Sequence, residues 1–134
     1  MTRTWPVTMR TLLVEDDRLT ANLLKTRLEW EGMKVRVAMN GLEALAMLQE
    51  EPVELVVTDL MMPAMNGFQL IQEIRRLPSP LGEVPIMVIS TNQNQQEMVS
   101  CFSAGADDFM TKPILIPLMM ERLWRLVQRG HPVE

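Results

Sequence analysis

Five short apolar segments alternate with five amphipathic segments along the 134-residue chain, and this alternation limits the fold more than any other feature. The apolar segments predict strands over residues 10–14, 33–38, 53–58, 85–90 and 108–111. The segments that follow them carry apolar residues at helical spacing and predict helices over 19–28, 42–48, 68–74, 95–104 and 114–128. Strands that alternate with helices form parallel units with right-handed crossovers. The sequence therefore predicts an α/β fold with helices on both faces of a parallel sheet.

The polarity of the predicted strands indicates their order in the sheet. The first, third and fourth strands are nearly continuous apolar runs, as expected of strands that helices cover on both faces. The second strand is the most polar, which suits an edge. This pattern favours a doubly wound, flavodoxin-like sheet of five strands in the order 2-1-3-4-5. We predict an N-terminal extension over 1–9, one domain over 10–129 and a C-terminal tail over 130–134.

Charge and composition exclude several other classes of protein. The net charge of -4 lacks the strongly basic character of a nucleic-acid-binding protein, so no direct binding to nucleic acid is expected. No apolar run reaches the roughly 18 residues of a membrane span, and the N-terminus lacks the apolar stretch of a signal peptide. Cys101 is the single cysteine of the chain, which rules out an intrachain disulfide and fits a reducing cytoplasm.

Chemically useful side chains follow four of the predicted strands. Glu15 and Asp16 follow the first strand, Asp59 the third, Ser90 ends the fourth and Lys112 follows the fifth. The carboxyl ends of parallel strands lie at one edge of a sheet, so these side chains are expected to converge. Two carboxylates at ~4 Å repel by about 4 kcal/mol at an effective dielectric constant of about 20. A hard divalent cation such as magnesium, which prefers oxygen ligands, would offset that repulsion.

Residues at these positions also have purely structural explanations, since an acid at the end of a strand can simply cap the next helix. Asp17, Ser90 and Asn66 can cap helices, and Lys112 can be a solvated charge. Their combination at four strand ends favours a chemical function instead. Asp59 can then act as a carboxylate nucleophile toward phosphorus, and no general base is needed because a carboxylate is already ionised.

Four stretches of the chain resemble the receiver domains of bacterial two-component signalling. The resemblance extends from about residue 10 to 129, and its most specific part is the third strand with the loop that follows it. The stretches lie at 12–17, 55–67, 86–90 and 104–113.

The resemblance implies a function and a set of site residues. The domain would accept a phosphoryl group on Asp59 in a reaction that depends on magnesium, with manganese as a possible substitute. Asp16, Asp59 and the backbone carbonyl of Met61 would bind the metal directly, and Glu15 would bind it through water. Ser90 and Lys112 would bind the phosphoryl group.

Five further positions either have roles that the resemblance implies or depart from the pattern of the family. Phe109 takes the place of the aromatic switch residue, which would act together with Ser90. Pro113 would follow a cis peptide bond that aims Lys112 inward. Thr91 stands where the family usually has a very small residue, so we expect it to act as a steric gate beside the phosphoryl group. Ile114 and Pro117 replace an aromatic residue and an acid, which calls the output face into question.

The resemblance also implies partners. The phosphoryl donor would be a sensor histidine kinase or a phosphotransfer protein, and the chain would catalyse only its own phosphorylation and dephosphorylation. The face of the last two helices would contact a second copy or an output domain. Helical methionines usually fill a core, which is the favoured interpretation here. The adjacent Met119 and Met120 are nevertheless not expected to point inward together, so an adaptable apolar contact face is the alternative.

Three alternatives remain open at this point. A flavin-binding flavodoxin would need a phosphate loop rich in Ser, Thr and Gly after the first strand, where this chain has acids. A phosphatase of the haloacid dehalogenase type would need an acid where Met61 stands. A pseudo-receiver would serve as a docking or dimerisation module without being phosphorylated. The sequence ends at Glu134 without an output domain, as expected of a stand-alone receiver or a piece of a longer regulator.

Overall fold

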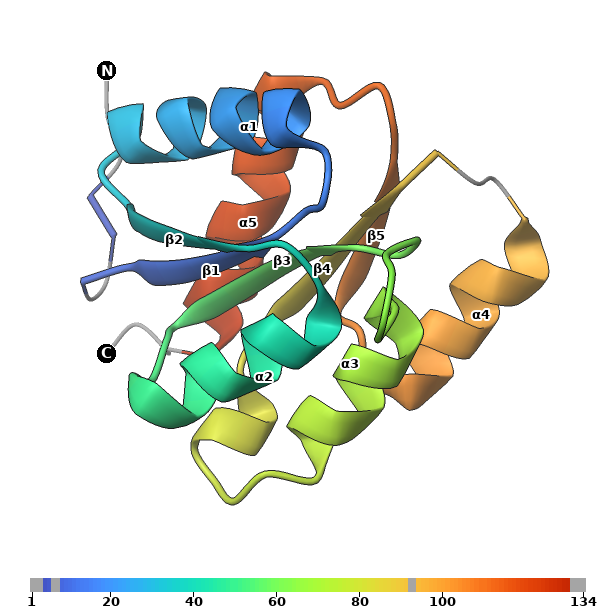
Figure 1. The fold of residues 1–134 in the computed structure, drawn as a ribbon. Helices are drawn as coiled ribbons and strands as arrows, with labels where there is room; N and C mark the ends of the chain where they lie inside the picture. The colour runs from blue at the N-terminus through green and yellow to red at the C-terminus, as the bar shows by residue number, and fades with distance from the viewer. Residues whose placement is uncertain (1–3, 6–7, 92–93, 131–134) are drawn as a thin grey trace.

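Five short strands form one parallel sheet in the order β2-β1-β3-β4-β5, as predicted. The computed structural model describes residues 4–5, 8–91 and 94–130. Helices α1 and α5 cover one face of the sheet, and α2, α3 and α4 cover the other (Figure 1). The elements are β1 (Arg10–Val14), α1 (Arg18–Trp30), β2 (Lys34–Ala38), α2 (Gly41–Glu50), β3 (Leu55–Asp59), α3 (Gly67–Arg75), the short 3₁₀ helix η1 (Leu81–Glu83), β4 (Ile86–Ser90), α4 (Gln95–Ala104), β5 (Asp108–Thr111) and α5 (Ile116–Gly130).

The central strands are buried on both faces because their residues alternate between two cores. In β1, Leu13 packs in the core under α1 and α5, whereas Leu12 and Val14 pack in the core under α2, α3 and α4. The same alternation runs through β3 and β4. Continuous apolar strands are therefore the sequence form of a two-sided sheet.

Most helices and strands begin or end a few residues away from their predicted bounds. The predicted bounds of β1, α4 and β5 agree with the structure. Helix α5 begins at Ile116, two residues later than predicted, and Pro117 lies in its first turn, where a missing backbone N–H costs no hydrogen bond. Asp17 caps α1 and Asn66 caps α3, as expected, because their side chains accept hydrogen bonds from the backbone of Thr20 and Gln69.

The expectation for Met119 and Met120 is wrong. Both side chains are buried, at 0% and 2% exposure, in the core beneath α5. Adjacent helical residues are ~100° apart, and an apolar stripe of that width accommodates both of them. The exposed apolar residues of the last two helices and the segment between them are Val99, Phe102, Leu115 and Leu118.

Trp5, which precedes β1 in the chain, contacts the end of α1 and helix α5. The indole N–H of Trp5 donates to the carbonyl of Glu31 at 3.0 Å, just past the end of α1. Its ring lies edge-on to the ring of Trp124 on α5, with 5.1 Å between the ring centroids. Trp5 thus joins α1 to α5 on the face that they share.

We predict that Trp5→Ala lowers the free energy of unfolding by about 1–3 kcal/mol, because it removes buried aromatic area and an edge-to-face pair. Urea unfolding would measure the change. Trp30→Ala is the matched control, since Trp30 is 59% exposed and contacts only the Arg27 guanidinium among the ring contacts of the described residues. It should cost less than about 1 kcal/mol. Equal losses in the two variants would mean that the Trp5 contact adds no stability of its own.

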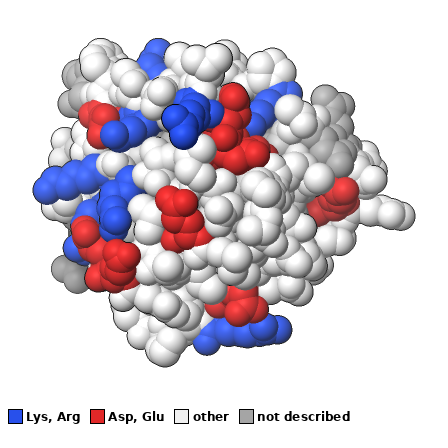
Figure 2. All heavy atoms as spheres, viewed as in Figure 1, with Lys and Arg blue, Asp and Glu red and all other residues white. Residues whose placement is uncertain are grey.

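Charged side chains of both signs are interspersed on the face shown in Figure 2. Among the described residues, no helix is long and apolar enough to cross a membrane.

Candidate phosphoryl and metal site

Three carboxylates converge at the carboxyl ends of β1 and β3. Oxygen atoms of Glu15, Asp16 and Asp59 lie within 4.8 Å of one another. Glu15 is fully buried and Asp59 nearly so, while Asp16 is exposed. Their oxygen ligands are of the kind that magnesium prefers, and the exposed Asp16 leaves room for the waters that this ion retains. These three residues can therefore hold a divalent cation.

Lys112 reaches the same cluster from the end of β5. Its Nζ atom lies 2.6 Å from Oε1 of Glu15 and 3.2 Å from Oδ2 of Asp59. Its backbone N–H donates to the carbonyl of Ser90 at 2.7 Å, which fixes the end of β5 against the end of β4. The peptide bond between Lys112 and Pro113 is cis, the isomer that the resemblance implies. One cation is thus in direct contact with two of the three carboxylates.

Burial and charge shift the ionisation of this group. Burial raises the pKa of the Glu15 carboxyl, an effect that the hydrogen bond from Lys112 opposes and that the charge of Asp59 increases. Burial tends to lower the pKa of the Lys112 ammonium, but its contacts with Glu15 and Asp59 outweigh burial and raise it. Lys112 is therefore held as a cation beside Asp59.

The backbone after β3 holds the Asp59 side chain. Oδ1 of Asp59 accepts hydrogen bonds from the N–H groups of Leu60, at 2.7 Å, and Met61, at 3.4 Å. Helix α3 then begins so close to β3 that a Cβ atom on Gly67 would lie 2.4 Å from the carbonyl oxygen of Asp59. Only glycine fits there, and this role of Gly67 was not predicted. Its place just after the Asn66 cap was the available signal.

The other predicted site residues lie around this cluster. Ser90 is buried at the end of β4, next to β5. Thr91 follows it and is exposed. The side chain of Met61 is 60% exposed, whereas Phe109 is buried in the core under α2, α3 and α4. The ligand role of Met61, the switch role of Phe109 and the gate role of Thr91 stay predictions.

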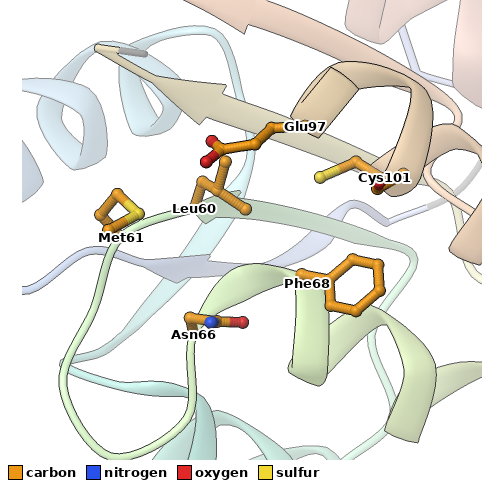
Figure 3. Close-up of a pocket in the computed structure, with 7 residues that line it drawn as sticks. Leu60, Met61, Asn66, Phe68, Glu97 and Cys101 are labelled. Atoms are coloured by element: carbon orange, nitrogen blue, oxygen red, sulfur yellow. The ribbon is translucent and has the colours of Figure 1, made fainter. Parts of the chain in front are cut away.

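A cavity of about 250 Å³ lies beside the loop that joins β3 to α3. Figure 3 shows Leu60, Met61, Asn66 and Phe68 on the side of β3 and α3, and Glu97 and Cys101 on the side of α4. Burial, followed by the nearby charge of Glu97, raises the pKa of the Cys101 thiol, which disfavours the reactive thiolate. No local sequence pattern predicts this cavity, because the residues that line it come from separate segments of the chain.

Residues 11–123 match the model described as the response regulator receiver domain. The chain belongs to this family. The flavin-binding and dehalogenase-type alternatives are thereby excluded. The chain is the receiver domain of a response regulator in two-component signalling.

Curated relatives agree with this assignment. The receiver domain is 33% identical over 124 residues to the response regulator MprA of Mycobacterium avium (strain 104), an alignment that covers 92% of this chain and 53% of that protein. It is 32% identical over 126 residues to MprA of Mycobacterium sp. (strain KMS), with 94% and 54% covered. The chain spans about half the length of these relatives.

Solved structures show the same fold. The receiver domain superposes on the signal receiver domain of a signal transduction histidine kinase from Syntrophus aciditrophicus with a TM-score of 0.85 and 29% identity, over 95% of this chain and 96% of that one. The receiver domain of the Francisella response regulator 1452 gives a TM-score of 0.83 and 28% identity, over 92% and 99%.

We predict that Thr91→Ala accelerates both phosphorylation by small donors and dephosphorylation. A β-branched side chain directly after Ser90 would obstruct a donor and an attacking water on the same path. A tenfold change in either rate corresponds to ~1.4 kcal/mol of barrier. Rates followed by intact mass would measure it, with Thr26→Ala on the exposed side of α1 as the control. Unchanged rates in both directions would mean that Thr91 points away and only begins the loop.

Proposed function

We propose that this receiver domain accepts a phosphoryl group on Asp59 and changes shape in response. The observation that carries the proposal is the placement of Asp59. One oxygen of its carboxylate accepts backbone N–H groups and the other accepts the Lys112 ammonium, inside a cluster of acids. A carboxylate fixed in this way is a nucleophile with a defined direction of attack.

The residues divide the work of the transfer. An Asp59 oxygen attacks phosphorus as the bond from phosphorus to the donor breaks; for a histidine donor this is the bond to an imidazole nitrogen. Lys112, released in part from Asp59, becomes the partner of a phosphoryl oxygen, and Ser90 donates a hydrogen bond to another. Glu15 keeps Lys112 in place through the 2.6 Å contact. Loss of the group to water restores the carboxylate.

The acids fit magnesium, and manganese in its place. Asp16, Asp59 and the carbonyl of Met61 would hold the ion, with Glu15 acting through water. When bound, the ion supplies positive charge that neutralises phosphoryl oxygens during the transfer.

The donor is proposed to be a sensor histidine kinase or a phosphotransfer protein. Helix α1 begins directly after the acids. Its Leu24 and Leu28 are buried, whereas Leu19 and Leu23 are 76% and 69% exposed, so the helix carries exposed apolar side chains. Apolar side chains exposed beside a reactive site suit a protein donor. A cytoplasmic location is part of the proposal, in keeping with the single cysteine of the chain, which fits a reducing compartment.

The output contact is proposed on α4, β5 and α5. Val99 and Phe102 on α4, together with Leu115 and Leu118 near the start of α5, are exposed apolar residues on the two helices that precede and follow β5 in the chain. A second copy of the chain or an output domain is the proposed partner there, in line with the greater length of the relatives.

Incubation with acetyl phosphate and magnesium, followed by intact mass, tests the proposal. We expect one phosphoryl group to be added in the presence of magnesium and none after chelation. A chain that gains no phosphoryl group from acetyl phosphate or from a panel of phosphorylated donor proteins would instead be a pseudo-receiver, used as a docking or dimerisation module.

A further inference from the structure

The cavity beside the loop that joins β3 to α3 has an apolar floor. Its least exposed lining residues are Leu60, at 4%, and Cys101, at 1%, and Phe68 adds an aromatic ring from the first turn of α3. An apolar cavity of ~150 Å³ is large enough to bind benzene. At about 250 Å³, this cavity can therefore hold one six-membered ring that carries a short chain.

Polar residues that are more exposed line the rest of the cavity. Ser100 is exposed and Glu97 is partly exposed. Figure 3 shows the Glu97 side chain extending from α4 toward Leu60 and Met61 on the other side of the cavity. The Oδ1 atom of Asn66 is engaged in the cap of α3. The cavity thus combines an apolar floor with a carboxylate nearer the solvent, as small-molecule sites commonly do.

The charge of the cavity is negative. Glu97 is the one charged side chain among the described residues that line it. Burial raises the pKa of the Cys101 thiol and the charge of Glu97 raises it further, so the thiol stays neutral near pH 7. An ammonium group would form a charge-assisted hydrogen bond with the Glu97 carboxylate, whereas an anion would be repelled by it.

We propose that this cavity binds a small organic cation, with an apolar ring against Leu60, Phe68 and Cys101 and a primary ammonium group beside Glu97. A neutral molecule of the same shape would fill the apolar floor without gaining from the carboxylate. Size therefore limits the ligand to about one ring, and charge selects the cation among ligands of that size.

The location brings the ligand close to the acids at the strand ends. Leu60 and Met61 line the cavity, and their backbone N–H groups donate to Oδ1 of Asp59. A bound cation would contact the segment that fixes this carboxylate. Binding requires no phosphoryl group, so the proposal does not depend on phosphorylation of Asp59.

Three probes of similar shape test the proposal, namely phenethylamine, 2-phenylethanol and phenylacetate, which are cationic, neutral and anionic near pH 7. Titrations of the isotopically labelled chain followed by NMR would give both affinity and location. We expect phenethylamine to bind with a Kd of about 1 mM or below, at least about tenfold more tightly than 2-phenylethanol, and phenylacetate to bind most weakly. The largest shifts should occur at the amides of Leu60, Phe68 and Cys101.

A matched pair of variants tests the role of the carboxylate. Glu97→Gln keeps the shape of the side chain, and it should lower phenethylamine affinity about tenfold while leaving 2-phenylethanol affinity unchanged. Glu43→Gln is the control, because Glu43 is an exposed acid in the first turn of α2, as Glu97 is an acid in the first turn of α4. Both changes remove a charge that favours a helix N-terminus, so a loss of stability common to both is structural. The control should keep the affinity for phenethylamine.

Several results would overturn the proposal. Equal affinities for phenethylamine and 2-phenylethanol would remove the preference for a cation, and an affinity for phenethylamine that Glu97→Gln leaves unchanged would remove the role of Glu97. Shifts centred on Glu15 and Asp16 would show that the ammonium group binds at the strand ends instead. No binding of phenethylamine at concentrations up to about 10 mM would show that the cavity holds only water. Spectra of the variants without probe report whether each is folded.

Discussion

Replacing Asp59 with asparagine is expected to abolish phosphorylation by acetyl phosphate and magnesium. The amide has nearly the same shape as the carboxylate and can keep its contacts with the backbone N–H groups of Leu60 and Met61. It lacks the negative charge and the nucleophilic oxygen pair on which attack at phosphorus depends. Intact mass should show no added phosphoryl group in this variant after the parent has reacted completely.

Asp17→Asn is the matched control for this experiment. Asp17 lies at the same edge of the sheet, and its carboxylate caps α1 by accepting the N–H of Thr20. Asparagine caps helices as well as aspartate does, so the fold should be kept while one nearby negative charge is lost. This control should still be phosphorylated. If Asp59→Asn gained a group with the lability of an acyl phosphate, the assignment of Asp59 would be wrong.

The sheet order and the convergence of the acids were predictable because both follow from periodic, local signals. The apolar runs in β1, β3 and β4 indicated that helices cover these strands on both faces, and the polar residues of β2 indicated a strand at the edge of the sheet. Once the strands are parallel, Glu15, Asp59 and Lys112 must lie at one edge, however far apart they are in the chain. Their contacts at 2.6 and 3.2 Å are the detailed result of that topology.

Features that depend on side chains from unrelated segments were not predictable in this way. Trp5 and Trp124 meet across nearly the whole length of the chain, and neither position belongs to a pattern that names its partner. Arg75 ends a helix like many surface arginines, and only the geometry of Gly105 and Val84 shows that its donors point inward. The prediction for Met119 and Met120 was wrong because the buried face of α5 is wide enough to include two adjacent residues.

Asp16→Ala is expected to lower magnesium affinity by about 10–100-fold or more, because it removes one of the few direct protein ligands that the ion would have. Calorimetric titration would measure the loss. Glu29→Ala is the matched control, since it removes one exposed negative charge from α1 without touching the acid cluster, and it should leave magnesium affinity nearly unchanged.

The same change should leave the metal-free protein as stable as the parent or more stable, by up to about 1 kcal/mol, because Asp16 is exposed and its repulsion of the other two carboxylates is screened. A metal ligand that destabilises the metal-free fold by repulsion would give both results, a loss of magnesium affinity and no loss of stability. Removing an acid with a purely structural role would instead lower stability without affecting metal affinity. Urea unfolding with a chelator present separates the two. Undiminished magnesium affinity in Asp16→Ala would show that the ion binds elsewhere, and a large loss of metal-free stability would show that Asp16 supports the fold instead.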